Sequence, residues 1–412
     1  MTIVPGKDIA VAAAVPVQRA IRVRPTARHL IIGGAILIAV LIPLVAKSFV
    51  VFQLTEVMIY GLAILGLNLL TGFNGQFSLG HSAFYGIGAY TAAILMHNYE
   101  VSYLWTLPAA GIVCFVIGFL FGLPALRLEG IYLALATFAL ADATPQIFKA
   151  SFLEHWTGGV QGIVIAKPAP PFGLPLNADQ WLYFFTLGVA TILYFCAANL
   201  VGSRTGRALV AIRDHPIAAS AMGINVALYK SLTFGVSALY TGIAGALGAI
   251  AIQFVAPDSF TFALAVALFV GLVVGGVGSI AGTLFGGAFV LFVPNIAEHI
   301  SKDLAGAVYG IILILLIYVM PTGAAGLVGW LTHRSLPKFA PLSSGLRAVG
   351  LKQRGSSRPG LRAARTSHQA AQGGHLKGGS DEETRDVGFA RRRGGRDLGP
   401  GMGAEEVRSG RE

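Results

Sequence analysis

Polar side chains that could contact a solute are concentrated in an otherwise apolar segment at 66–92, GLNLLTGFNGQFSLGHSAFYGIGAYTA. Amide, hydroxyl and imidazole groups are costly in an apolar environment unless they bond to one another or line a hydrated cavity. The glycines among them allow a helix to break and two backbones to approach closely. We therefore expect a pair of helices that faces a solute path, although any single polar residue could instead bond between helices. The candidate path-lining residues are Asn68, Asn74, Gln76, Ser78, His81 and, from a later segment, Asp142.

Two of these candidates carry ionisable groups. Asp142 is the acid that we place well inside a membrane span, in the helix expected to begin near Ile131. A carboxylate there can pair with a cation, bind an amino group or bond to a neighbouring helix. His81 is flanked by a glycine and a serine, and it suits either hydrogen bonding between helices or proton transfer. We expect Asn68, Gln76 and His81 to face the interior, and the lipid-facing or packing positions to include Leu69, Phe77 and Phe84.

Motifs for catalysis are missing from the sequence. It contains no G-x-x-x-x-G-K-[ST] phosphate loop, no pair of histidines at helical spacing and no nucleophile elbow. The string GVGSIA at 276–281 resembles a dinucleotide fingerprint but lies in an apolar run, where Gly278, Gly282 and Gly286 favour close helix packing. Cys114 and Cys196 fall in apolar segments and are interpreted as small hydrophobic residues. We therefore expect no enzyme activity, no metal and no cofactor in this chain.

The composition explains where these residues must sit. With 55% hydrophobic and 12% charged residues, and a mean hydropathy of +0.70, the chain has more apolar surface than one water-soluble core could bury. A hydrocarbon layer about 30 Å thick needs about 20 helical residues. We predict an all-α, polytopic membrane helix bundle of about ten transmembrane helices. They are expected at 30–46, 51–72, 77–97, 104–125, 131–149, 181–201, 231–254, 260–275, 280–297 and 305–321.

The charges predict the organisation and orientation of the chain. We expect a basic N-terminal segment at 1–29, a transmembrane domain at 30–332 and a disordered basic tail at 333–412, where Gly, Ser and Arg dominate. Lys and Arg are retained on the cytoplasmic side of a membrane, and most of them fall on the side of the N-terminus if that end is inside. An even number of spans then places both termini in the cytoplasm. The lipid bilayer is the expected environment, and no nucleic-acid partner is expected.

A basic loop interrupts the apolar spans at 202–230, GSRTGRALVAIRDHPIAASAMGINVALYK. Asp214 or His215 could cap a short helix, Pro216 suits its first turn and Gly223 supplies a left-handed stop. That helix would carry an apolar face into water, formed by Ile217, Ala218, Ala221, Met222 and Ile224. Such a face favours a protein partner, and a helix lying on lipid headgroups is the equal alternative.

Several of these stretches resemble the permeases of branched-chain amino acid ABC importers of the LivM type. The resemblance rests on 66–92, on RLEGIYLALATFALAD at 127–142, on WTGGVQGI at 156–163 and on GRALVAIRDHPIAASAMGIN at 206–225. GGVGSIAGTLFGGAF at 275–289 and PTGAAGL at 321–327 follow in the expected order. The resemblance covers about residues 30–330 and excludes the tail.

The resemblance implies a bacterial inner-membrane importer in which this chain is one membrane half. Its partners would be a second permease subunit, two cytoplasmic ATPase subunits that use ATP, and a periplasmic substrate-binding protein. The loop at 203–225 resembles the ATPase-docking motif of the family, although Ile217 stands where the wider motif has an acid. The docking residues implied by the resemblance are Arg207, Arg213, Asp214, Ile217, Ala218, Ala219, Met222 and Gly223.

Other transport functions remain open from the sequence. Similar permeases import urea or short-chain amides, so the substrate is not fixed. An ion-coupled secondary carrier would use an intramembrane acid such as Asp142 and would need no ATPase partner. A passive channel for a small polar solute would need no energy source at all.

Truncation after Arg334 should leave membrane insertion and solute uptake close to the full-length level. The segment 335–412 has no apolar pattern that could form a core. Membrane fractionation and uptake assays on the truncated chain measure both properties. Loss of either one would mean that the basic tail has a role.

Overall fold

The structure is a computed structural model that describes residues 34, 39–128, 130–168, 170, 176–300, 302, 304–319, 323–324 and 326. The chain divides into two units, Met1–Lys338 and Phe339–Glu412, and all described residues belong to the first. The basic segment at 1–29 and the tail at 333–412 lie outside the described residues. The first expected span, 30–46, is described only in part, with helical backbone at 39–45.

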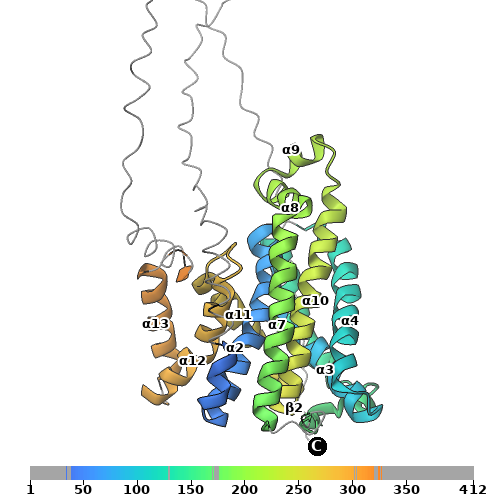
Figure 1. Ribbon diagram of the computed structural model, residues 1–412. Coiled ribbons are helices and arrows are strands. Elements are labelled where there is room, and N and C mark those ends of the chain that lie inside the picture. Colours follow the sequence, from blue (N-terminus) through green and yellow to red (C-terminus); the bar gives the residue numbers. More distant parts are fainter. Residues whose placement is uncertain are drawn as a thin grey trace, which may run out of the picture. The chain divides into compact units, whose positions relative to one another are not determined.

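Helices dominate the described part of the chain, as the composition predicts (Figure 1). The long ones are α2 (Ser48–Leu67), α3 (His81–Asn98), α4 (Tyr103–Ala125), α5 (Ile131–Phe148), α7 (Ala178–Gly202), α10 (Val226–Ile252), α11 (Phe262–Gly275), α12 (Gly282–Ile300) and α13 (Ala305–Val319). The short ones are α6 (Glu154–Thr157), α8 (Arg204–Asp214), α9 (Pro216–Ala221) and the 3-10 turns η2 (Gly159–Gln161) and η4 (Pro257–Phe260).

Each of the nine expected spans from 51–72 onward corresponds to a helix in the described residues. Six segments there are long and apolar enough to cross a membrane: Ser48–Phe73, Tyr103–Ala125, Ile131–Phe148, Ala178–Gly202, Val226–Ile252 and Pro257–Gly275. α3, α12 and α13 are helical but are not among these six. The predicted all-α, polytopic membrane fold is confirmed.

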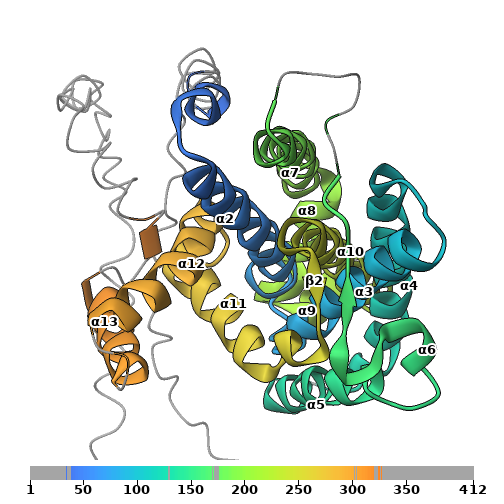
Figure 2. The same ribbon diagram turned by 90° about the horizontal axis from the view of Figure 1, so that it is seen from below.

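Helix α10 occupies the interior of the bundle. It packs against α2, α3 and α4, and the view along the bundle in Figure 2 places it among these helices. In an apolar stretch of 18 residues within α10, 78% of the residues are buried, whereas in the corresponding stretch of α7 only 17% are buried. Glycine, alanine and serine make up much of its sequence, VALYKSLTFGVSALYTGIAGALGAIAI, so neighbouring backbones can approach closely. α10 is therefore the core helix, and α7 offers most of its surface to lipid or to a partner.

The crossing of α3 and α10 brings two backbones into contact. A Cβ atom added to Gly88 would overlap the carbonyl oxygen of Gly242, and one added to Gly245 would overlap that of Tyr85. α11 and α12 cross in the same way, with Gly282 against Gly275 and Gly286 against Gly271. The packing role predicted for Gly282 and Gly286 is confirmed, and the third glycine of that series, Gly278, lies in the turn between α11 and α12.

The helix pair expected at 66–92 is broken as its glycines suggest. α2 continues into one π-helical segment, η1 (Asn68–Phe73), and the chain then runs without regular structure to His81, where α3 begins. Gly75 has a φ of 76°, which turns the chain within this break. The second helix therefore begins four residues later than the expected 77. We call residues 74–80 the break segment.

A two-stranded sheet connects two loops at the C-terminal end of α10. Strands β1 (Ile163–Val164) and β2 (Phe254–Val255) pair antiparallel, with Ile163 opposite Val255. The amide of Ile165 also donates to the carbonyl of Gln253 over 2.9 Å. Nearby ion pairs join Lys149 to Asp258 and Lys167 to Asp179. These contacts, which we call the β clasp, tie the loop after α5 to the end of α10.

Candidate functional site

The basic loop at 203–225 forms two short helices, α8 and α9, and the first begins at a side-chain cap. The Ser203 hydroxyl accepts from the amides of Thr205 and Gly206 and starts α8. His215 precedes α9, Pro216 is its first residue, and Gly223 follows it with a φ of 84°. The predicted first-turn proline and left-handed glycine are confirmed, and His215 occupies the N-cap position, but its side chain forms no capping hydrogen bond. We call α8 and α9 together with their connections the docking loop.

Helix α9 turns its apolar side chains outward. Ile217 and Met222 are each 85% exposed, and Ala218 and Ala221 are also exposed. Ala219 is buried against the rest of the bundle. In Figure 1 the docking loop lies at the end of the bundle opposite the β clasp. An apolar face in that position is either covered by a partner or laid on lipid.

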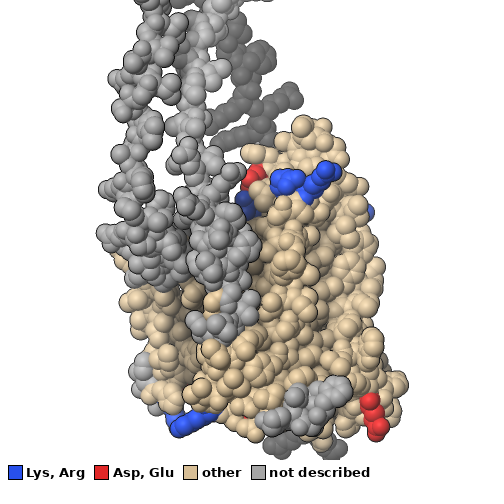
Figure 3. All heavy atoms as spheres, in the orientation of Figure 1, with Lys and Arg blue, Asp and Glu red and all other residues tan. Residues whose placement is uncertain are grey.

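Basic side chains lie on α8, the helix that precedes this apolar face in the chain. Arg204, Arg207 and Arg213 are exposed, and Figure 3 shows Lys and Arg gathered at the end that carries α8 and α9, above a wide uncharged band. Arg213 donates through Nε to Asp214 over 3.0 Å and through Nη1 to the carbonyl of Gly72 over 2.8 Å. The second bond ties the docking loop to the π-helical segment η1.

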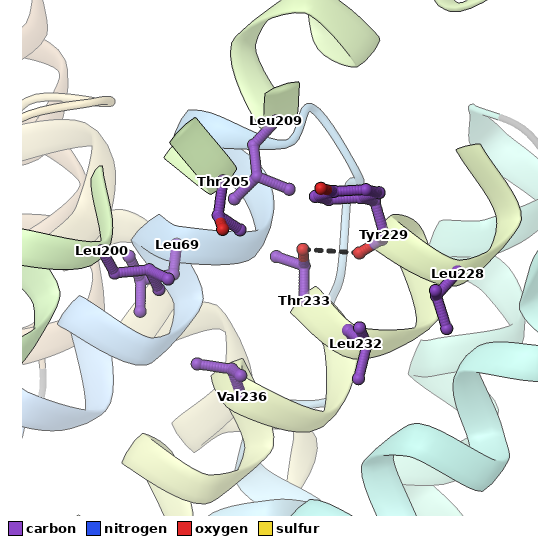
Figure 4. Close-up of a pocket in the computed structure, with 9 residues that line it drawn as sticks. All are labelled: Leu69, Leu200, Thr205, Leu209, Leu228, Tyr229, Leu232, Thr233 and Val236. Carbon is purple, nitrogen blue, oxygen red and sulfur yellow. Dashed lines mark hydrogen bonds between the residues drawn. The ribbon is translucent and has the colours of Figure 1, made fainter. Parts of the chain in front are cut away.

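An apolar pocket lies beneath α8. Its volume is about 210 Å³, and Figure 4 shows that its lining comes from α7, α8, α10 and the start of η1. The polar Thr233 hydroxyl is directed to the carbonyl of Tyr229 over 2.7 Å, within the same helix. A ligand in this pocket would contact mainly apolar side chains and few polar groups. Its lining residues are Leu69, Leu200, Thr205, Leu209, Leu228, Tyr229, Leu232, Thr233 and Val236.

Asn68 clamps the turn between α11 and α12. Its Nδ2 donates to the carbonyl of Ser279 over 2.9 Å, and its Oδ1 accepts from the amide of Gly278 over 2.8 Å. The side chain is fully buried. Both ends of the amide are therefore used to join η1 to a segment more than two hundred residues later in the chain.

His81 lies in a buried chain of hydrogen bonds between α3 and α10. The bonds run from Ser78 to His81 Nδ1 at 3.1 Å, from His81 Nε2 to Ser237 at 2.7 Å, and from Ser237 to the carbonyl of Gly66 at 2.6 Å. Because the Ser237 hydroxyl donates to that carbonyl, its oxygen accepts from His81 Nε2–H, and Nδ1 accepts from Ser78. A neutral imidazole satisfies this whole chain, which favours a role in joining helices.

Asn74 and Gln76 differ from the other polar side chains of the segment. They are 2% and 6% exposed. Both side-chain polar atoms of Asn74 and the Oε1 atom of Gln76 have no hydrogen-bond partner among the described residues. Both residues line a cleft beside the docking loop. The expected inward orientation of Asn68, Gln76 and His81 is confirmed by their burial, and path lining itself stays a prediction.

The expected packing positions show two environments. Leu69 and Phe84 are fully buried, whereas Phe77 is 40% exposed and packs its ring against Phe269 with centroids 4.7 Å apart. The apolar side chains of this segment therefore serve packing more than lipid contact within the described unit.

Two acids lie inside long helices, in different environments. Asp142 lies within α5, as predicted, and its role in a solute path stays a prediction. Asp142 lies on an exposed face of α5. Glu56, in contrast, is 3% exposed inside α2, and its Oε1 atom has no partner among the described residues. Glu56 falls near the start of the expected span at 51–72, whereas α2 begins at Ser48 and places it about two turns inside.

Comparison with known proteins gives a consistent set of relatives. The family described as "Branched-chain amino acid transport system / permease component" matches residues 49–317. The LivM permease of Salmonella typhimurium is 34% identical over 277 residues, which cover 61% of this chain and 64% of that protein. LivM of Escherichia coli K12 is 32% identical over 317 residues, covering 70% of this chain and 73% of that protein.

A second type of permease is also similar. LivH of Salmonella typhimurium is 27% identical over 290 residues, 65% of this chain and 91% of that protein. No solved structure matches the chain. The match to the Salmonella LivM thus spans just under two thirds of that relative, and the family match contains both the polar segment at 66–92 and the docking loop.

Proposed function

The chain belongs to the branched-chain amino acid transport system permease family, and from that premise we propose that it is one membrane subunit of an ATP-driven importer. The observation that carries the proposal is the outward apolar face of α9, with Ile217 and Met222 each 85% exposed at one end of a membrane helix bundle. A permease of this kind moves its substrate by coupling to ATP hydrolysis in another chain. The docking loop is the surface that offers this contact.

The docking loop suits a protein groove by its chemistry. Burying one large apolar side chain is worth about 1.5–3 kcal/mol, so Ile217 and Met222 together could supply much of a specific contact. The exposed arginines of α8, Arg204, Arg207 and Arg213, add positive charge to the docking loop, and charge of this kind favours specificity and rapid association. Two cytoplasmic ATPase subunits, one for each membrane subunit, are the proposed partners on this side.

The orientation of the protein follows from the same charges. We propose that the docking loop lies in the cytoplasm and the β clasp in the periplasm, because Lys and Arg are retained on the inner side of the membrane. A periplasmic substrate-binding protein would then meet the clasp end, and a LivH-like second permease would complete the path. In this arrangement the bacterial inner membrane holds the chain with both termini inside.

The proposed substrates are branched-chain amino acids, from the names of the LivM relatives. An ion-coupled carrier is the second candidate, because Glu56 is buried with no partner for its Oε1 atom among the described residues, and such carriers use buried carboxyl groups. The two functions differ in their energy source, which is open to direct measurement.

Uptake of labelled leucine into cells or vesicles that hold ATP should continue when a protonophore removes the ion gradient, and it should stop when ATP is withdrawn. An excess of unlabelled isoleucine should compete, whereas urea and acetamide should not. The matched control is the same membrane without this chain. Arrest by the protonophore with ATP intact would establish the carrier, and uptake without any energy source would establish a channel.

A further inference from the structure

A second polar site lies where the break segment meets the docking loop. A cleft of about 190 Å³ opens between residues 74–77, the start of α5, the junction of α8 and α9, and the start of α10. We call it the loop cleft. At about 30 Å³ for each water in the liquid, it has room for several waters or for one solute the size of an amino acid. The polar residues that line it are Asn74, Gln76, Arg213 and Lys230, and Gly130 and Pro216 also line it.

The side-chain amides of Asn74 and Gln76 in the loop cleft lack hydrogen-bond partners, although the backbone that carries Gln76 is fixed. The backbone of Gln76 is fixed at both ends, since its amide donates to Leu70 over 3.2 Å and its carbonyl accepts from Thr71 over 3.0 Å. Yet Gln76 Oε1 and both polar atoms of Asn74 have no partner among the described residues, although the two side chains are at least nine-tenths buried. Buried polar groups of this kind call for a ligand or ordered water.

The described charged residues that line the loop cleft are basic. They are Arg213 and Lys230, and no acid is among the lining residues that the structure describes. Asp214 lies beside the cleft and accepts from Arg213 Nε. The bonds of Arg213 to Asp214 and to the carbonyl of Gly72 use two of its five N–H donors and hold the guanidinium at the cleft wall.

These groups define the chemistry of a ligand. Arg213, Lys230 and the Asn74 Nδ2 group are donors and suit an anionic oxygen group. The Oδ1 of Asn74 and the Oε1 of Gln76 are acceptors and suit an ammonium or another donor. A ligand that satisfies both sets carries an anionic group and an ammonium group a few bonds apart.

We propose that the loop cleft binds such a zwitterion, either a free amino acid from the cytoplasm or the headgroup of an aminophospholipid, and that occupancy restrains the docking loop. The restraint follows because the ligand would bridge residues 74–77 to the junction of α8 and α9, and so stabilise this arrangement over others. This regulatory step rests on the proposed function, whereas binding itself does not.

A cysteine at Phe77 provides a local test of binding. Phe77 lines the loop cleft and is 40% exposed. In the assembled transporter without Cys114 and Cys196, in nanodiscs of phosphatidylglycerol, leucine should slow alkylation of Phe77→Cys by an impermeant thiol reagent. The carboxylate analogue 4-methylpentanoate and the amine analogue 3-methylbutylamine should each be needed at about tenfold or higher concentration, which corresponds to about 1.4 kcal/mol.

Variants locate the effect in the loop cleft. Gln76→Leu and Lys230→Gln should each remove the protection, and Lys230→Arg, which keeps the charge, should retain it. Lys302→Gln is the matched control, because Lys302 is exposed and does not line the cleft. Unchanged protection in both Gln76→Leu and Lys230→Gln would overturn the site, as would a lack of protection by any zwitterion, which would leave the cleft filled by water.

The source of the ligand and its effect have separate readouts. If added phosphatidylethanolamine protects the cysteine with the same dependence on Gln76 and Lys230, and leucine does not, the headgroup is the ligand. For the restraint, leucine on the cytoplasmic side should lower ATP hydrolysis several-fold in the wild type and not in Lys230→Gln. If leucine protects the cysteine but lowers ATP hydrolysis equally in the wild type and in Lys230→Gln, the site stands and only the proposed restraint of the docking loop is wrong. If the ATPase subunits do not bind this chain at all, the proposed function is wrong.

Discussion

Met222→Asp is expected to abolish co-purification of the ATPase subunits while the chain still inserts into the membrane. The Met222 side chain is 85% exposed on α9, so the aspartate is solvated in the free subunit and folding is not at risk. In the complex the same carboxylate would be buried without a partner, at a cost of about 3–5 kcal/mol. That cost corresponds to a loss of affinity of about a hundredfold or more.

Co-purification and substrate-stimulated ATP hydrolysis in reconstituted vesicles measure this effect. Val160→Asp is the matched control, since Val160 is 67% exposed near the β clasp, away from the docking loop. Ala218→Asp should act in the same direction as Met222→Asp, because Ala218 is exposed on the same helix. If the aspartate variants kept both properties at the wild-type level, α9 would not be the docking surface.

Gly223→Val tests the geometry of the docking loop instead of its chemistry. Gly223 has a φ of 84° and no atom within 4 Å of an added Cβ, so the variant introduces backbone strain and no clash. A β-branched residue disfavours this left-handed conformation, and the chain would leave α9 in a different direction. We expect reduced ATP hydrolysis with partial association, and Gly223→Asn should be milder because asparagine tolerates this region.

Gly88→Val should prevent stable folding of the membrane domain. The added side chain would overlap the carbonyl oxygen of Gly242, which is backbone and cannot rotate away. Relief requires α3 and α10 to separate, and α10 is the core helix of the described unit. The expected loss is at least about 3 kcal/mol, which is large compared with the total stability of most domains.

The yield of monodisperse protein and the midpoint of thermal unfolding in detergent measure this loss. Gly245→Ala should act in the same direction, because its methyl group would overlap the carbonyl of Tyr85. Gly188→Val is the matched control, since Gly188 lies on an exposed face of α7 with open space around it. An equal midpoint for Gly88→Val and Gly188→Val would contradict the close crossing.

Features set by local chemistry could be predicted from the sequence. The first turn of α9 follows from Pro216 and its end from Gly223, because a proline and a glycine restrict the backbone wherever they stand. The spans follow from long apolar runs, and the broken helix at 66–92 follows from its glycines and polar residues. In each case the cause and the structure lie within about 30 residues of one another.

Features that depend on distant segments could not be predicted. The partners of Asn68 are Gly278 and Ser279, and nothing near Asn68 in the sequence indicates that turn. The same holds for the pairing of Gly88 with Gly242, because many glycines could serve a close crossing. Glu56 was missed for a different reason: a single charged residue can lie inside a span when other helices bury it.

The length and continuity of α10 suggest how the two faces of the membrane could communicate. The helix begins directly after the docking loop, at the Asn225 cap, and ends one residue before β2 of the clasp. Its 27 residues span about 40 Å. It contains no proline, unlike α4, α5 and α12. A continuous helix of this kind moves as a rigid body. A displacement of the docking loop would therefore tilt α10 and move the β clasp at its other end, without successive side-chain rearrangements in between.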